Sequence, residues 1–224
     1  MFVDPKTIEF FSTEAVLVKV HGEKDTALTS QYCVSGYPTL VMLGTDGKEI
    51  DRVPGFMPTD EFIQTFRDYG KGIGTLSSLI ARAADTVDRN LYMQIAEKYK
   101  YGCDKAAAVD WYNKVITAGK PKDSLSGVSK LELADMYRRS KKYDSALLAY
   151  QKISKDFKKT SFASDADWYV GDVYRRMKDT TRAIAAFENW MTKYPKADTS
   201  EVSYTKGVID KLKNPPAPKP EEKK

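Results

Sequence analysis

Residues 131–153, LELADMYRRSKKYDSALLAYQKI, contain the pattern that decides the fold of most of this chain. Small, aromatic and aliphatic residues recur here at separations of three and four, which place side chains on one face of an α-helix. The same residue types return in the same order in a copy before this stretch and in a copy after it. The stretch therefore predicts a pair of helices that forms one unit of an internal repeat.

Three copies of the repeat align on Tyr99, Tyr137 and Tyr174, which lie 38 and 37 residues apart. Five further columns match in every copy: an aliphatic residue, a small residue, an alanine, an aromatic residue and a second apolar residue. In that order the columns are Ile95, Leu133 and Val170; Ala96, Ala134 and Gly171; Ala108, Ala146 and Ala183; Tyr112, Tyr150 and Phe187; and Val115, Ile153 and Trp190. We expect the tyrosine and aromatic columns to fill the space between helices. Since one hairpin cannot bury its apolar face alone, the copies should stack.

The pattern resembles the tetratricopeptide repeat (TPR), whose small, tyrosine, alanine and aromatic columns are all present. The family's late proline is Pro195 in the third copy, is approximated by Pro121 in the first copy and is absent from the second. The resemblance implies an all-α helical array of three TPR-like repeats over residues 89–197. The period exceeds the roughly 34 residues of the family, so we expect longer loops at residues 120–127 and 158–164. The alternative is a generic array of helical hairpins without TPR ancestry.

The resemblance also implies that the first helices of the repeats form a groove that binds a protein or peptide partner. The groove columns hold an acid followed by mainly basic residues: Glu97, Asp135 and Asp172; Lys100, Arg138 and Arg175; and Tyr101, Arg139 and Arg176. Family members that bind chaperone tails have Asn in place of the acid, which argues against that ligand here. The candidate partner-binding residues are Arg138, Arg139, Arg175 and Arg176, which would suit an acidic partner. Alternatively, each acid pairs within its own helix with the base three residues later, which contributes about 0.2–0.5 kcal/mol.

The segments that flank the repeats also carry signals. Residues 198–213 predict an amphipathic helix that caps the array, with its N-cap among residues 198–200. The tail, residues 214–224, is rich in proline and charge, so we expect it to be disordered. Glycines in residues 70–79 predict a hinge, and residues 71–88 should comprise this hinge and a helix that leads into the first repeat.

The N-terminal part, residues 1–70, has a different pattern. Runs rich in β-branched residues predict three strands, and the Asp46-Gly47 turn predicts that the last two form a hairpin. Helix start and stop signals predict two helices. The predicted strands are residues 15–20, 39–43 and 48–53, and the predicted helices are residues 25–34 and 59–70. Elements in this order make half of an α/β sandwich.

The sequences YCVSGYPTLVML (32–43), DGKEIDRVPGF (46–56) and VLVKVHGEKD (16–25) resemble the thioredoxin family. The resemblance implies an α/β thioredoxin-like partial domain, which lacks the first strands and the CxxC helix of the family. In that family the proline that matches Pro38 is cis, and the residue before it, here Tyr37, faces an extended substrate peptide. Tyr37 and Pro38 are therefore the candidate substrate-binding residues. A cis X–Pro bond costs only about 0.5–1 kcal/mol over trans; the alternative is a trans proline that begins a strand.

Cys33 and Cys103 are the two cysteines of the chain. Because they fall in different predicted domains, we expect two separate, partly buried thiols rather than a disulfide framework, a redox pair or a metal site. Without a CxxC motif the chain as given has no candidate catalytic residue.

The missing central strand of the family would leave unpaired edges on the strands at residues 15–20 and 39–43. We therefore expect the chain to be a truncated form of a longer thiol–disulfide oxidoreductase that acts in redox homeostasis. As given, it should serve as a protein–protein interaction scaffold without a redox centre. The alternative is a non-catalytic TPR adaptor with a degenerate thioredoxin-like module. The resemblance includes many exported bacterial proteins, which favours the bacterial periplasm or cell envelope but leaves the compartment unknown and the cytoplasm open.

Composition excludes several other classes of function. The net charge of +5 comes from 36 basic and 31 acidic residues that are interleaved, which argues against a nucleic-acid-binding face. No apolar run approaches the roughly 20 residues that span a bilayer, and the first residues do not form a signal peptide. His21 is the only histidine, and it lacks a nearby cluster of cysteines or acids. We therefore expect no metal and no cofactor.

Overall fold

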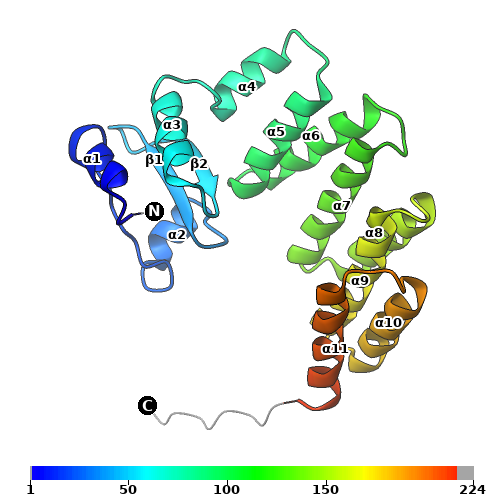
Figure 1. The fold of residues 1–224 in the computed structure, drawn as a ribbon. Helices are drawn as coiled ribbons and strands as arrows, with labels where there is room; N and C mark the ends of the chain where they lie inside the picture. Colours follow the sequence, from blue (N-terminus) through cyan, green and yellow to red (C-terminus); the bar gives the residue numbers. More distant parts are fainter. Residues whose placement is uncertain (1, 216–224) are drawn as a thin grey trace, which may run out of the picture. The chain divides into compact units, whose positions relative to one another are not determined.

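The computed structural model describes residues 2–215, so the disorder predicted for residues 216–224 lies outside the described residues. The chain forms two compact units, Met1–Ala118 (unit 1) and Gly119–Lys224 (unit 2). The elements of unit 1, drawn in Figure 1, are α1 (Pro5–Thr13), α2 (Thr26–Gln31), β1 (Thr39–Leu43), β2 (Glu49–Pro54), α3 (Thr59–Gly70), α4 (Leu76–Ala83), α5 (Arg89–Tyr101) and α6 (Lys105–Thr117). Those of unit 2 are α7 (Ser124–Arg139), α8 (Tyr143–Asp156), α9 (Ser161–Arg176), α10 (Thr180–Lys193) and α11 (Thr199–Lys213).

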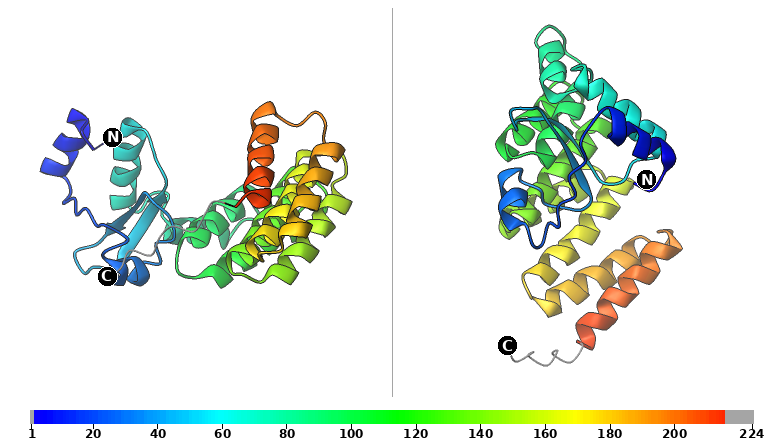
Figure 2. Two further views of the ribbon diagram at one scale, coloured as in Figure 1. Left: turned by 90° about the horizontal axis from the view of Figure 1, so that it is seen from below. Right: turned by 90° about the vertical axis from the view of Figure 1, so that its left-hand side faces the viewer.

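Strands β1 and β2 form the predicted antiparallel hairpin, in which Leu40 lies opposite Val53. The turn depends on Gly47, whose φ of +76° is in the left-handed region that glycine enters without steric cost. The Gly47 N–H donates to the Gly44 carbonyl at 3.0 Å. Helix α3 packs against β2 (Figure 2), so the predictions of the hairpin and of the helix at residues 59–70 are confirmed.

Helices α1 and α3 and strand β2 share an apolar core in this part of unit 1, formed by Phe10, Val53, Phe62, Ile63 and Phe66. Helix α1 is absent from the predicted elements, although the sequence carries its start signal. The Asp4 side chain accepts a hydrogen bond from the Lys6 N–H at 2.9 Å, and Pro5 occupies the first helical position. Proline is favoured there because the first N–H groups of a helix have no intrahelical partner.

The strand predicted at residues 15–20 is not formed. Val16, Leu17, Val18 and Val20 in this segment are between 40% and 90% exposed. In the described part of the chain the sheet contains β1 and β2, and neither pairs with this segment. A run of β-branched residues therefore favours a strand, but the strand forms only when a neighbouring strand hydrogen-bonds its backbone N–H and C=O groups.

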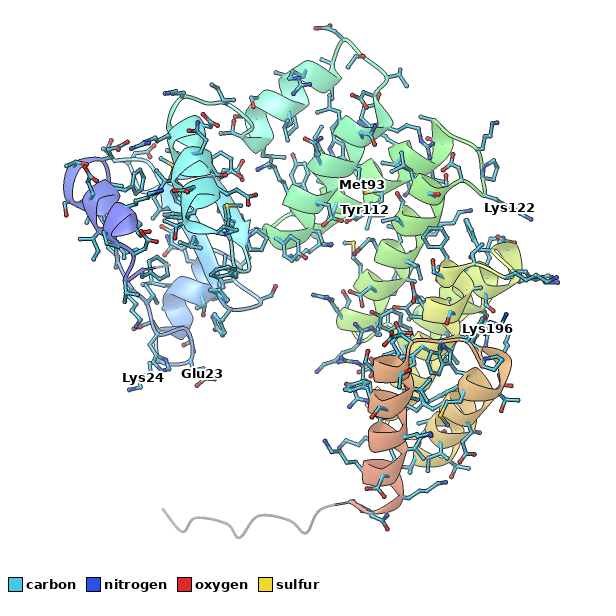
Figure 3. The ribbon with its side chains drawn as sticks, viewed as in Figure 1. Glu23, Lys24, Met93, Tyr112, Lys122 and Lys196 are labelled. Carbon is cyan, nitrogen blue, oxygen red and sulfur yellow. A yellow bond between two sulfur atoms is a disulfide. The ribbon has the colours of Figure 1, made fainter. Side chains whose placement is uncertain are left out.

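The hairpin of α5 and α6 is the first predicted repeat and belongs to unit 1. Tyr112 of α6, labelled in Figure 3, is fully buried, and its hydroxyl donates to Glu97 Oε1 on α5 at 2.5 Å. Ala96 and Ala108 are also fully buried, so small side chains lie where the two helices approach. Helix α4, the predicted leading helix, packs against α5.

The second and third repeats are the pairs α7–α8 and α9–α10 of unit 2, in which successive helices pack on one another. The spacing repeated within the chain places the small, alanine and aromatic columns in the interior. The fully buried members include Ala134, Ala146, Tyr150, Ala183 and Phe187. Helix α11 packs on α10. Its N-cap is Asp198, which accepts the Ser200 N–H at 2.8 Å, so the helix predicted at residues 198–213 is confirmed.

Two details of the repeats differ from the predictions. Tyr137 is 37% exposed, so in the second repeat the tyrosine column does not fill the space between helices. Part of the long period lies in the first helices, because α7 and α9 have 16 residues whereas α5 has 13. Helix α7 begins at Ser124, where the Asp123 side chain accepts the Ser126 N–H at 2.9 Å. The loops predicted to extend to residues 127 and 164 are therefore shorter than expected.

Candidate functional site

The loop before β1 carries the candidate substrate-binding residues of unit 1. The Tyr37–Pro38 peptide bond is cis, as predicted. The Pro38 carbonyl accepts the Gly55 N–H at 2.8 Å, and Thr39 Oγ1 donates to the Gly36 carbonyl at 2.8 Å. These bonds attach the loop to the end of the hairpin, while the Tyr37 side chain is 62% exposed.

The ring of Tyr37 lies directly against Gly22. A Cβ atom added to Gly22 would lie 2.3 Å from this ring, so glycine is the residue that lets the ring rest there. The loop thus presents an aromatic surface beside exposed backbone, which is a surface that an extended peptide can contact.

Cys33 and Cys103 form a disulfide bond, with their Cα atoms 5.2 Å apart. The expectation of two separate thiols is therefore wrong. Cys33 lies between α2 and the Tyr37–Pro38 loop, and Cys103 lies in the turn between α5 and α6. The two residues are 70 positions apart, and they meet because the first repeat packs with the N-terminal part in unit 1. No local pattern in the sequence reports such a contact.

A buried polar cluster holds the same two parts of unit 1 together. Asp51 of β2 accepts from Lys98 Nζ on α5 at 2.8 Å and from the Leu76 N–H at the start of α4 at 2.6 Å. Arg52 of β2 donates from Nη1 to the Tyr101 carbonyl of α5 at 2.7 Å. Asp51 and Arg52 are each 4% exposed, and buried charges require such partners. The segment predicted to be a hinge is therefore anchored where α4 begins.

In unit 2, Asp135 and Asp172 bind the candidate partner-binding arginines. Each aspartate pairs with arginines three and four residues later on its own helix. In the first repeat Glu97 pairs with Lys100, three residues later, at 2.6 Å. The alternative of intrahelical pairing is therefore confirmed. In addition, Arg138 Nη1 reaches from α7 to Asp172 Oδ2 on α9 at 2.5 Å. The group, here called the arginine cluster, consists of Asp135, Arg138, Arg139, Asp172, Arg175 and Arg176.

The arginines of the cluster differ in exposure. The side chain of Arg138 is 8% exposed, whereas those of Arg139, Arg175 and Arg176 are 64%, 41% and 41% exposed. The guanidinium group of Arg138 also lies over the ring of Tyr169, 5.0 Å from its centre. Arg138 is therefore a structural link between two repeats, while the other three arginines face solvent.

Ion pairing keeps the cluster charged despite its partial burial. Burial acts to raise the pKa of Asp172, but hydrogen bonds from Arg176 and Arg175 outweigh this effect, so its pKa lies below the ordinary value. Burial acts to lower the pKa of Arg138, but the hydrogen bond and the charge of Asp135 raise it above the ordinary value. Four guanidinium groups share two carboxylates, so the cluster keeps a net charge of +2.

Other kinds of site are not seen in the described residues. Within residues 2–215, no three side chains of His, Cys, Asp or Glu are grouped so that they could hold a metal ion. His21 lies in an exposed loop. The same residues include no helix whose length and apolar character would let it cross a bilayer.

Comparison with protein families gives two adjacent matches. A thioredoxin-like domain matches residues 4–70, and a tetratricopeptide repeat-like domain matches residues 76–213. The second match covers more than half of the chain. This chain belongs to the tetratricopeptide repeat-like family. None of the curated proteins compared with the chain matches it.

The TPR-like match runs from α4 to α11, and the thioredoxin-like match runs from α1 to α3. The protein is therefore a fused thioredoxin-like and TPR-like protein, and its repeats indicate interaction with other proteins. The disulfide and the Arg52–Tyr101 hydrogen bond both connect the two domains. The sequence analysis does not predict the contacts of Asp51 and Arg52. Two adjacent charged residues inside the predicted strand KEIDRV (48–53) are the signal that could have indicated them.

Proposed function

We propose that this protein is a protein–protein interaction scaffold, whose TPR-like array binds an acidic segment of a partner through Arg139, Arg175 and Arg176. The observation that carries the proposal is the net charge of +2 of the arginine cluster, in which these three side chains are exposed. Electrostatic complementarity of this kind selects partners and accelerates their association.

The aspartates of the cluster prepare the arginines for binding. Arg139 donates from Nε to Asp135, and Arg176 donates from Nε to Asp172. A guanidinium group carries five N–H donors, so its terminal amino groups can bind a carboxylate of the partner in a bidentate manner. Side chains that are already oriented lose less conformational freedom on binding, which favours affinity.

The Tyr37–Pro38 loop of unit 1 is proposed as a contact for an extended segment of a partner. Its support is the exposed ring of Tyr37, the cis peptide bond and the resemblance of the surrounding sequence to the thioredoxin family. In such binding, backbone hydrogen bonds give affinity and side-chain surfaces give specificity.

We propose further that the chain is a truncated form of a thiol–disulfide oxidoreductase that acts in redox homeostasis. Support comes from the small sheet, because β1 pairs with β2 on one edge and the apolar residues Val16, Leu17, Val18 and Val20 are exposed. A two-stranded hairpin is marginal by itself, and a further strand followed by a CxxC helix would complete it.

The mass of the protein isolated from its own cells tests the truncation. We expect a mass above 25.3 kDa and a tryptic peptide that contains CxxC. A native protein with the mass of this chain would contradict the proposal. The chain itself should not accelerate the reduction of insulin by dithiothreitol, because it holds no CxxC pair.

Peptide binding tests the scaffold. Fluorescence anisotropy of a short labelled peptide of alternating Glu and Ser should show binding to the full chain, and a matched Lys–Ser peptide should not bind. Because the Debye length falls from about 30 Å at 0.01 M salt to about 3 Å at 1 M, affinity for the acidic peptide should fall steeply over this range. Equal affinity for both peptides, or no binding of the acidic peptide, would contradict the proposal.

A further inference from the structure

Residues 21–38 form a surface segment of unit 1 that contributes no buried side chain. The segment contains α2, whose N-cap residue Asp25 makes no capping hydrogen bond. Glu23 and Lys24, in the loop before α2, extend away from the rest of the unit (Figure 3). Segments with few buried apolar contacts open at a low free-energy cost, so the stability of this one depends on how it is attached.

Hydrogen bonds to the hairpin and one covalent bond attach this segment to its surroundings. The Tyr32 hydroxyl donates to the Gly47 carbonyl at 3.2 Å, and the Pro38 carbonyl accepts the Gly55 N–H at 2.8 Å. Both hydrogen bonds lead to the β1–β2 hairpin and its flanks. The covalent bond is the disulfide to Cys103, which leads to the first repeat.

The disulfide is accessible from solvent, because Cys103 is exposed and its partner Cys33 is half-buried. The packing of the first repeat against β2 has its own attachments, the Asp51–Lys98 ion pair and the bond from Arg52 to the Tyr101 carbonyl. Opening the disulfide would therefore leave residues 21–38 attached only through the hairpin, and would leave the repeat in place.

We propose that Cys33–Cys103 is a reversible redox site, which a dithiol reductant opens by thiol–disulfide exchange. Opening the disulfide loosens residues 21–38, which include the Tyr37–Pro38 loop. A thiolate of the reductant attacks Cys103 Sγ, a mixed disulfide forms, and the thiolate of Cys33 leaves and takes a proton from water. The second thiol of the reductant then displaces Cys103. The protein disulfide gains two electrons and two protons, and the dithiol becomes a disulfide.

The location of Cys103 favours the last step. The residue directly precedes Asp104, the N-cap of α6, so the departing thiolate forms at the positive end of a helix dipole. Release of the loop does not depend on peptide binding, so a protein that failed to bind any peptide could still show it. The redox site and the proposed scaffold function are therefore tested separately.

Hydrogen exchange of the full chain in its oxidised and reduced forms tests the proposal. Dithiothreitol under native conditions acts on one bond, because both cysteines of the chain are in this disulfide. Alkylation should show that two thiols appear. Backbone amides of residues 21–38 should then exchange about tenfold faster or more, a change equivalent to about 1.4 kcal/mol, with a smaller change in β2 and α5.

A Cys33→Ser/Cys103→Ser variant is the matched control, because it should exchange like the reduced protein whether or not reductant is present. Unit 2, which holds neither cysteine, should exchange equally in all forms. Three results would overturn the proposal: a disulfide that resists excess dithiothreitol under native conditions, unchanged exchange of residues 21–38 after reduction, or an equal acceleration throughout unit 1.

Discussion

Arg138 Nη1 on α7 lies 2.5 Å from Asp172 Oδ2 on α9, which joins the first helices of two successive repeats. Asp172 also binds Arg175 and Arg176, and Arg138 also binds Asp135. In repeat proteins, stability is approximately the sum of the repeats and of the contacts between neighbours. The Arg138–Asp172 pair is a contact between neighbouring repeats. Asp172 also holds Arg175 and Arg176, which we propose to bind a partner.

Asp172→Asn tests the structural importance of this pair. The substitution leaves the buried guanidinium group of Arg138 with one ionic partner, and breaking a buried pair typically costs about 3–5 kcal/mol. We expect urea unfolding, followed by tryptophan fluorescence, to show a loss of this order. Glu188→Gln is the control, because Glu188 and its partner Lys213 are 50% and 52% exposed, and exposed pairs contribute about 0–1 kcal/mol. Equal losses in both variants would contradict the prediction.

The contribution of Asp172 should depend on pH in a defined direction. Its folded-state pKa lies below the unfolded value, which is about 3.9. The stability that it contributes is therefore fully present above the unfolded pKa and is lost as the pH falls through the folded pKa. The difference in unfolding free energy between the wild type and Asp172→Asn should be constant above about pH 5 and should shrink below about pH 4. A difference that persists in strong acid would show that charge is not its cause.

Two Gly→Ala substitutions in helices should have opposite effects on stability. An added Cβ at Gly171 would lie 2.6 Å from the ring of Phe187, which is fully buried, whereas no atom lies within 4 Å of a Cβ at Gly207. Overpacking at Gly171 should cost about 1–3 kcal/mol. Gly207→Ala should stabilise α11 by up to about 1 kcal/mol, because alanine favours the helix. Thermal unfolding measures both, and shifts of the same sign would contradict the packing at Gly171.

The sequence predicts those features of the fold that local patterns encode. The Asp135–Arg138 pair and the capping helix that begins after Asp198 involve residues within a few positions of one another, so spacing reveals them. The β1–β2 hairpin is predictable for the same reason, since the turn at Gly47 fixes it.

Contacts between residues far apart in the sequence are not visible in such local patterns. The Cys33–Cys103 disulfide spans 70 positions, and the Arg138–Asp172 pair spans 34. Each depends on how helices pack, and packing is not visible as periodicity. The strand predicted at residues 15–20 fails for a related reason, because a strand requires a partner as well as suitable residues. The sequence therefore identifies the candidate arginines but not that Arg138 is buried.

The central claim is that the exposed arginines of the cluster bind an acidic partner. The direct test is the affinity of the full chain for the Glu–Ser peptide after the three exposed arginines are replaced by Gln, which can still donate to the aspartates. The test variant is Arg139→Gln/Arg175→Gln/Arg176→Gln. The control variant removes the same charge from exposed side chains elsewhere in unit 2 and is Lys152→Gln/Arg182→Gln/Lys213→Gln.

We predict that the test variant loses about tenfold or more in affinity, equivalent to about 1.4 kcal/mol or more, while the control variant stays close to the wild type. Circular dichroism should show the same helical content in all three proteins. Unchanged affinity in the test variant, or an equal loss in both variants, would contradict the assignment of Arg139, Arg175 and Arg176 as the binding surface.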